Sequence, residues 1–512
     1  MARRTYLKNA AILTVTGLIL RAAGMFLRVY VAARIGAEGM GVYQLITTVY
    51  NLAITVATAG LSVAATRVCA DLAGAGKFTQ ARPAMRRILL LSAVMGLTAA
   101  FGLAGLSRVA AQWWLKDMRA VLPLRILAPS LPFMAMSAVL RGYFLAVRDV
   151  RPNSEAQLLE QAVRIGLVAL LLGRVGSADV ETACAAVVVG NTISEACSWA
   201  YMAVRYGRSG RGSTKGPSPS HLGGTLAGIL VPIAANQYLT SLLRTVENVM
   251  VPGCLALFTL SRETALAQYG ALKGMAMPVL FFPFSFLSTL ATLLLPDITE
   301  AHVRGDTRAL KRLIDRVLMI TLTMSILMSG VFTMLAYPLA EVLYHDAEIG
   351  FYLSVLGPLM PFMYMESMVD GILKGLNEQL STFRYSVVDS VVRIVLIALL
   401  APRFGMKGFL FVMLVSNLLT SLLNLHRLLD VTGMHIHWGK WVLGPLLCFG
   451  LAGGACRLVL APLLEQRLST LGWGLAAGAF MTLVYFMLLL FTGTLTLEDL
   501  WLKKKKTVDN RG

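Results

Sequence analysis

The sequence predicts an all-α polytopic membrane protein of about fourteen transmembrane helices, with two six-helix lobes and two further C-terminal helices. Of the 512 residues, 57% are hydrophobic and only 14% are charged, and the mean hydropathy is +0.69. Soluble proteins carry roughly 25% charged residues, whereas apolar runs of about 20 residues, long enough to cross a bilayer, recur along this chain. The net charge of +19 follows alternate loops, which indicates membrane topology, so no nucleic-acid partner is expected.

Apolar windows separated by charged or Gly/Pro/Asn-rich breaks predict the individual helices. The fourteen spans lie near residues 9–33, 41–66, 84–106, 119–145, 154–174, 180–204, 222–249, 264–297, 309–336, 350–373, 380–402, 407–427, 439–462 and 470–492. The first span is too long for a signal peptide and is interpreted as an uncleaved helix. The eighth contains Pro278, Pro283 and Pro296 and is therefore expected to be kinked.

The basic residues predict the topology. They are about three times as frequent in the loops on one side of the membrane as on the other, which predicts that both termini are cytoplasmic. The membrane is expected to be the plasma membrane. The basic tail at 503–506 is interpreted as a topology anchor facing anionic membrane lipids.

An internal repeat predicts the domain organisation. Residues 129–171, shifted by 229 positions, fall on 358–400 with 13 of 43 residues identical. Prolines and paired charges keep register: Pro129 falls on Pro358, Glu160 on Asp389 and Arg164 on Arg393. The shift spans an even number of helices, so the repeat is parallel, which is a transporter arrangement. The predicted parts are an N-lobe at 1–204, a cytoplasmic linker at 205–221, a C-lobe at 222–428, two added helices at 429–495 and a basic tail at 496–512.

Two arginines in the first span predict an anion site. Arg21 and Arg28 are two helical turns apart and share one face, and no acidic residue precedes Ala37. Arg244, at the start of the second lobe, adds a third cation. A guanidinium is always charged and binds phosphate bidentately, so these residues are candidate pyrophosphate ligands in a cavity between the lobes. The alternative is that they reach the interface or pair with other helices.

Further charges in the spans are candidates for cavity contacts or intramembrane charge pairs. They are Arg141, Glu160, Arg164, Glu247, Glu366, Asp370, Lys374, Asp389 and Arg393. The Glu/Asp-x-x-x-Arg pairs are either structural pins, one in each lobe, or substrate contacts. Glu247 and Asp389 could carry Na⁺ or H⁺, although pairing with Arg244 and Arg393 explains them equally well. No catalytic motif, cofactor motif or metal-ligand spacing occurs, so neither an enzyme nor a metal site is expected.

Several motifs resemble a known family. Leu140-Arg-Gly-Tyr-Phe144, Pro152, Glu160-Gln-x-x-Arg164, Arg244-x-x-Glu247 and Gly274-Met-Ala-Met-Pro278 are similar to segments of stage V sporulation proteins. These belong to the polysaccharide biosynthesis protein family of the multidrug/oligosaccharidyl-lipid/polysaccharide (MOP) exporter superfamily, which includes the lipid II flippases. The resemblance covers most of residues 5–430 and implies a MATE-like fold that exports an undecaprenyl-pyrophosphate-linked glycan.

The resemblance also implies roles for residues and partners. Arg21 and Arg28 occupy places comparable to those of arginines that meet the pyrophosphate in the lipid II flippases. Those flippases also carry a cavity arginine on helix two, whereas residues 41–66 here contain no charge, which favours another lipid-linked glycan. Peptidoglycan polymerases are candidate partners, and a monomer is expected.

The leading hypothesis is therefore a flippase that exports a peptidoglycan precursor or similar glycan, for the cell wall or the spore cortex, by alternating access. One alternative is a cation-coupled multidrug antiporter of the same fold. The other is a membrane scaffold that transports nothing.

Overall fold

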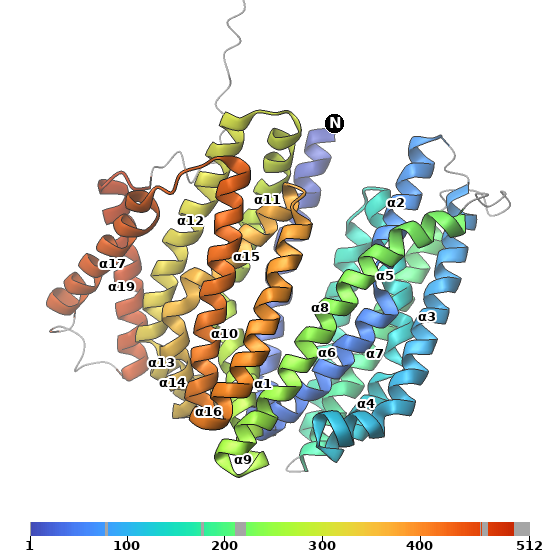
Figure 1. The fold of residues 1–512 in the computed structure, drawn as a ribbon, viewed down its shortest axis with the longest axis horizontal. Coiled ribbons are helices and arrows are strands. Elements are labelled where there is room, and N and C mark those ends of the chain that lie inside the picture. The colour runs from blue at the N-terminus through green and yellow to red at the C-terminus, as the bar shows by residue number, and fades with distance from the viewer. Residues whose placement is uncertain are drawn as a thin grey trace, which may run out of the picture. The chain divides into compact units, whose positions relative to one another are not determined.

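The computed structural model describes residues 2–76, 80–175, 179–209, 222–460, 462 and 469–495. Every regular element in these ranges is a helix, as predicted (Figure 1). By packing, the chain divides into two compact units: Met1–Ser285 with Ser386–Met413, and Phe286–Tyr385 with Leu414–Gly512. This division differs from the predicted lobes, which rest on the sequence repeat, and the lobe bounds stay a prediction.

The first unit is built around a long, bent helix. Its helices are α1 (Ala2–Thr58), α2 (Leu61–Gly74), α3 (Ala81–Val109), α4 (Val121–Leu127), α5 (Ser130–Ala146), α6 (Arg151–Val175), α7 (Val180–Arg208), α8 (Leu222–Thr259), α9 (Arg262–Tyr269), α10 (Met277–Phe281) and the middle part of α16. The central helix α5 packs against α2, α3 and α7, and α7 also packs along α6. A π-helical turn, Gly270–Ala276, joins α9 to α10.

The second unit contains the remaining helices. They are α11 (Phe284–Val303, from its third residue), α12 (Thr307–Met334), α13 (Ala336–Tyr344), α14 (Ala347–Leu356), α15 (Met360–Gly375), both ends of α16 (Gln379–Thr432), α17 (Gly444–Ala455) and α19 (Thr470–Phe491). Helix α12 packs against α15 and α17, and α17 packs against α19. Buried Tyr485 donates a hydrogen bond to the Thr323 carbonyl oxygen at 2.9 Å, which ties α19 to α12.

Two glycines bend the longest helices. Gly36 has φ 70° within α1 and Gly405 has φ 59° within α16, and this left-handed region is readily open only to glycine. Each bend falls between two predicted spans, 9–33 and 41–66 in α1, and 380–402 and 407–427 in α16. The kink expected in the eighth span is an interruption at residues 282–283, between α10 and α11.

Helical segments overlie all fourteen predicted spans within the described ranges. By length and composition, six helices there are long and apolar enough to cross a membrane, or seven if the pair 118–127 and 130–146, bent by 45°, counts as one span. The chain is thus a multi-pass membrane protein, and the count of fourteen crossings stays a prediction.

The helix boundaries follow the internal repeat. A shift of 229 residues carries the first residue of α5 to position 359, and α15 begins at Met360. The same shift carries the first residue of α6 to position 380, and α16 begins at Gln379. Helix α7 continues to Arg208, so the beginning of the predicted linker is helical. Residues 210–221 of that linker and the predicted tail, 496–512, lie outside the described residues.

Candidate functional site

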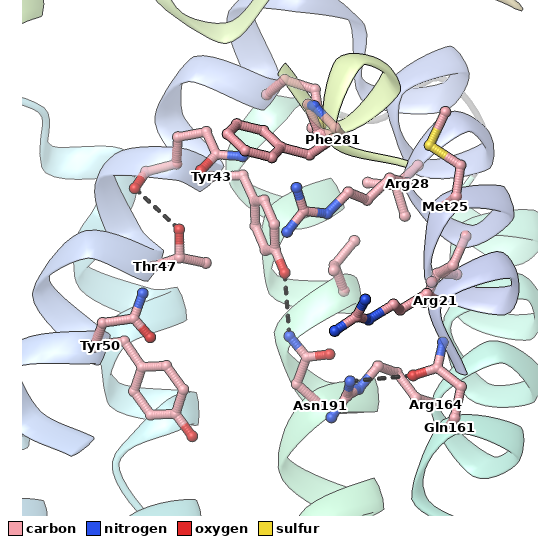
Figure 2. A pocket seen from close by; sticks show the side chains of 18 of the residues that line it. Arg21, Met25, Arg28, Tyr43, Thr47, Tyr50, Gln161, Arg164, Asn191 and Phe281 are labelled. Atoms are coloured by element: carbon pink, nitrogen blue, oxygen red, sulfur yellow. Dashed lines mark hydrogen bonds between the residues drawn. The ribbon is translucent and has the colours of Figure 1, made fainter. Parts of the chain in front are cut away.

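The first unit contains a cavity of about 690 Å³ (Figure 2). Its walls come from both halves of α1, from α5, α6 and α7, from α10, and from the residues that lead into the first turn of α11. Such a volume lies in the range of pockets that hold small molecules or the head group of a larger one.

Because α1 bends at Gly36, both halves of the helix line this cavity. The half before the bend supplies Arg21 and Arg28, and the half after it supplies Tyr43 and Tyr50. Figure 2 shows the two arginines pointing from α1 toward the side where Tyr43 and Asn191 lie.

Close backbone contact holds the second half of α1 in place. A Cβ atom on Gly270 would lie 2.0 Å from the Ala37 carbonyl oxygen, and one on Gly41 would lie 2.1 Å from the Leu266 carbonyl oxygen. Only glycine permits so close an approach, as at small-residue contacts between membrane helices. The π-helical turn that begins at Gly270 therefore lies directly against α1.

The charged residues lining the cavity are mainly cationic. Among the described residues, Arg21, Arg28 and Arg164 line it together with one acidic residue, Glu195, which gives a formal charge of +2. Arg21 donates a hydrogen bond from Nη1 to the Ser285 carbonyl oxygen at 3.1 Å. Because guanidinium groups remain ionised, this lining favours an anionic ligand.

Uncharged polar groups line another part of the cavity. Asn191 donates a hydrogen bond from Nδ2 to the Tyr43 hydroxyl at 3.3 Å. The Tyr50 hydroxyl makes a short hydrogen bond with Ser130 and contacts the Met134 sulfur at 3.2 Å. Amides and tyrosine rings of this kind suit a ligand with hydroxyl groups and an apolar face.

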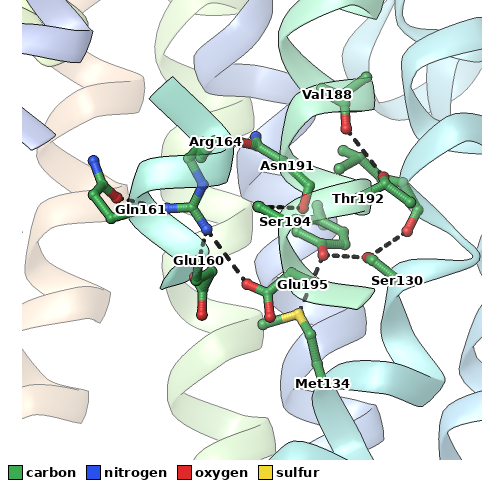
Figure 3. A network of polar contacts seen from close by, with 12 residues as sticks. Ser130, Met134, Glu160, Gln161, Arg164, Val188, Asn191, Thr192, Ser194 and Glu195 are labelled. Carbon is green, nitrogen blue, oxygen red and sulfur yellow. Dashed lines mark hydrogen bonds and ion pairs between the residues drawn. The ribbon is translucent and has the colours of Figure 1, made fainter. Parts of the chain in front are cut away.

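Ion pairs fix the third cavity arginine (Figure 3). Nη2 of Arg164 lies 2.6 Å from Glu160 and 3.5 Å from Glu195, and Nη1 donates to Gln161 at 3.3 Å. Arg141 reaches the other oxygen of Glu160 at 3.4 Å. The predicted Glu160-x-x-x-Arg164 pair thus belongs to a network of three helices, α5, α6 and α7.

The equivalent charges on α16 form a second network in the same unit. Arg393 lies 3.0 Å from Glu247 on α8 and 2.5 Å from Asp389, and both carboxylates are almost fully buried. Neither Arg393 nor its partners line the cavity, and Arg244 does not line it either. The structure therefore brings Arg21 and Arg28 together at the cavity and leaves Arg244 exposed on α8.

The stripe predicted on the tenth span lies on α15 in the second unit. Lys374 pairs with Asp370 at 2.6 Å, and Glu366 is half-buried one turn earlier.

Sequence reasoning missed several residues of the cavity lining, above all Glu195, Asn191 and Tyr43. The sequence could have identified Glu195, because it is an acidic residue deep in the span 180–204. Ionisable residues within membrane helices commonly have functional roles. The uncharged residues carried no such signal.

The family and fold matches that follow point to a membrane transporter or flippase rather than an enzyme. The chain belongs to the polysaccharide biosynthesis protein family, whose family model matches residues 6–302, within the MOP superfamily. A second family model, MatE, matches residues 232–399.

Individual proteins agree with this membership. Stage V sporulation protein B of Bacillus subtilis (strain 168) is 26% identical over 502 residues, which are 96% of either chain. The solved structure of the lipid II flippase MurJ, in an inward closed conformation, matches with a TM-score of 0.71 at 13% identity, over 94% of this chain and 98% of that one. An inward-facing multidrug resistance MATE family transporter of the MOP superfamily matches with a TM-score of 0.66 at 13% identity, over 83% of this chain and all of that one.

Proposed function

We propose that the protein is a flippase for a lipid-linked glycan of the cell wall or spore cortex, and that Arg21 and Arg28 bind its pyrophosphate. The supporting observation is the cavity lining, with three arginines to one carboxylate. The amides and tyrosines around Asn191 suit the hydroxyl groups of the adjoining sugar. The prenyl chain stays in lipid, while the protein exposes the cavity alternately to the two sides of the plasma membrane, with both termini in the cytoplasm.

The relatives support the same proposal. The family name refers to polysaccharide biosynthesis, and one structural neighbour is named a lipid II flippase.

Export of a labelled undecaprenyl-pyrophosphate-linked disaccharide from reconstituted liposomes tests the proposal. A hydrogen bond to a charged group contributes about 1.5–3 kcal/mol, so the double variant Arg21→Ala/Arg28→Ala is expected to bind the lipid at least roughly a hundredfold more weakly. Arg21→Lys/Arg28→Lys, which keeps charge but loses the bidentate geometry, is expected to be intermediate.

Arg244→Ala is the matched control, because Arg244 is an exposed arginine outside the cavity lining. Normal export by a correctly inserted Arg21→Ala/Arg28→Ala variant would refute the proposed site. An equal loss in Arg244→Ala would show that general positive charge, rather than this cavity, supports export.

One observation favours a second candidate, a cation-coupled multidrug antiporter. Glu195 offers the cavity a carboxylate that could attract a cationic drug. Efflux of a cationic dye that is lost in Glu195→Gln and unaffected by Arg21→Ala/Arg28→Ala would favour this function over glycan export.

A further inference from the structure

Glu195 on α7 is a buried carboxylate at the wall of the cavity (Figure 3). Its side chain is 9% exposed. Oε1 lies 3.5 Å from Nη2 of Arg164, a long contact for an ion pair. Oε2 is buried and has no hydrogen-bond partner in the part of the chain that the structure describes. An ionised carboxylate that is so poorly partnered is expensive to bury.

Glu160 competes with Glu195 for the same guanidinium and holds it more closely. Its Oε1 lies 2.6 Å from Arg164 and its Oε2 lies 3.4 Å from Arg141, so Glu160 pairs with both neighbouring cations. Glu160 and Glu195 lie against the same nitrogen atom, Nη2 of Arg164. Two ionised carboxylates at this nitrogen repel each other, whereas a protonated Glu195 carries no charge.

The other elements packed against Glu195 leave its second oxygen without a donor among the described residues. Tyr50 on α1 interacts electrostatically with Glu195, but the Tyr50 hydroxyl is hydrogen-bonded to Ser130 and contacts the Met134 sulfur. From α5 and α6, the charged groups that face Glu195 are Arg141, Arg164 and Glu160.

The second network provides a contrast within the same unit. Arg393 contacts both oxygens of Glu247, at 3.0 and 3.2 Å, and Asp389 at 2.5 Å. Those carboxylates were the sequence-based candidates for ion coupling, and both pair closely with Arg393. The acid that faces the cavity is instead Glu195.

We propose that Glu195 is a proton-binding site, and that its protonation tightens the binding of the anionic ligand beside Arg21 and Arg28. The ligand part of this inference rests on the proposed function. Protonation raises the formal charge of the cavity lining from +2 to +3, so the proton and the anion bind cooperatively. The coupling is reciprocal: a bound pyrophosphate must raise the affinity of Glu195 for its proton by the same factor.

The test combines two measurements on the full-length protein in detergent. Difference infrared spectroscopy over a pH titration reports protonated carboxyl groups through their carbonyl band. Calorimetric titration with farnesyl pyrophosphate over the same pH range reports anion affinity. In the wild type we expect a titrating carbonyl band, and an affinity that rises by roughly 5–150-fold from mildly alkaline to mildly acidic pH.

Two matched variants locate the proton. In Glu195→Gln, a neutral mimic of the protonated acid, the band is expected to disappear, and the affinity at alkaline pH should rise to the acidic wild-type level. In Glu160→Gln, Arg164 is free to pair with Glu195, so the pH dependence should persist with its midpoint moved to more acidic pH. Thermal unfolding of each variant checks that it is folded.

The outcomes separate this proposal from the proposed function. A wild-type pH dependence retained in Glu195→Gln would overturn the proton site, as would its loss in Glu160→Gln alone. If farnesyl pyrophosphate does not bind the wild type at any pH, the proposed function fails, and the infrared band alone decides whether Glu195 takes up a proton.

Discussion

Removal of the Arg393 side chain tests whether the second charge network is a structural pin. In Arg393→Met the side chain keeps much of its apolar volume but leaves Glu247 and Asp389 without their shared cation. Those carboxylates are only 5% and 6% exposed, so water cannot replace the guanidinium. Breaking a buried ion pair by removal of one partner costs about 3–5 kcal/mol.

A second calculation bounds this cost. A carboxylate that has lost its cation can be neutralised by binding a proton. At pH 7 this protonation costs about 4 kcal/mol for a group with an ordinary pKa near 4. The free energy of unfolding of Arg393→Met should therefore fall by about 3–5 kcal/mol at neutral pH. The triple variant Arg393→Met/Glu247→Gln/Asp389→Asn removes all three charges of the network and should recover most of this loss.

The assay is unfolding of the purified protein in mixed micelles by titration with sodium dodecyl sulfate, followed by tryptophan fluorescence. Arg427→Met serves as the control, because Arg427 pairs with Glu378 at 2.9 Å but the two side chains are 35% and 22% exposed. An exposed pair contributes about 1 kcal/mol or less. Equal losses in the two arginine variants, or a triple variant as unstable as the single one, would refute this account of the network.

Two further predictions concern packing and pH. Gly270→Ala would place its Cβ atom 2.0 Å from the Ala37 carbonyl oxygen, so α1 would have to move. We expect the free energy of unfolding to fall by about 1–3 kcal/mol in the same assay. An unchanged unfolding midpoint would contradict the close contact. At the start of α16, hydrogen bonds from Ser381 and Arg427 lower the pKa of Glu378 below its usual 4.5. A carboxylate whose pKa is lowered on folding stabilises the fold at pH values above its unfolded-state pKa. The difference in unfolding free energy between wild type and Glu378→Gln should therefore be full at neutral pH and vanish as the pH falls through the folded-state pKa of Glu378. A difference that grows on acidification would contradict the pairing.

The helical fold could be predicted because its signals are local. Apolar runs, glycine and proline breaks and the internal repeat all act over a few turns of helix, and the helices begin within one residue of the repeat. The bend at Gly36 is one such case, since a glycine between two apolar runs indicates a change of direction.

The partners of the charged residues could not be predicted in the same way. Glu247 pairs with Arg393, 146 residues away, rather than with Arg244 three residues away, because helix spacing reveals only neighbours on the same helix. The cavity had the same limitation. Arg21 and Arg28 were found because they share one helix face, whereas Glu195 reaches them only through the packing of α7 against α1 and α6.

The excess of cavity cations over carboxylates has an electrical consequence. With Glu195 ionised, the lining charge is +2 in the empty cavity, and a doubly ionised pyrophosphate diester brings it to zero. With Glu195 protonated, the two values are +3 and +1, so the occupied cavity carries two positive charges fewer than the empty one in either case. A potential that is negative inside acts on each unbalanced charge with about 2.3 kcal/mol per 100 mV. Under the proposed function, such a potential favours return of the unloaded carrier toward the cytoplasm and opposes outward movement of the loaded carrier less, so the resting voltage favours export.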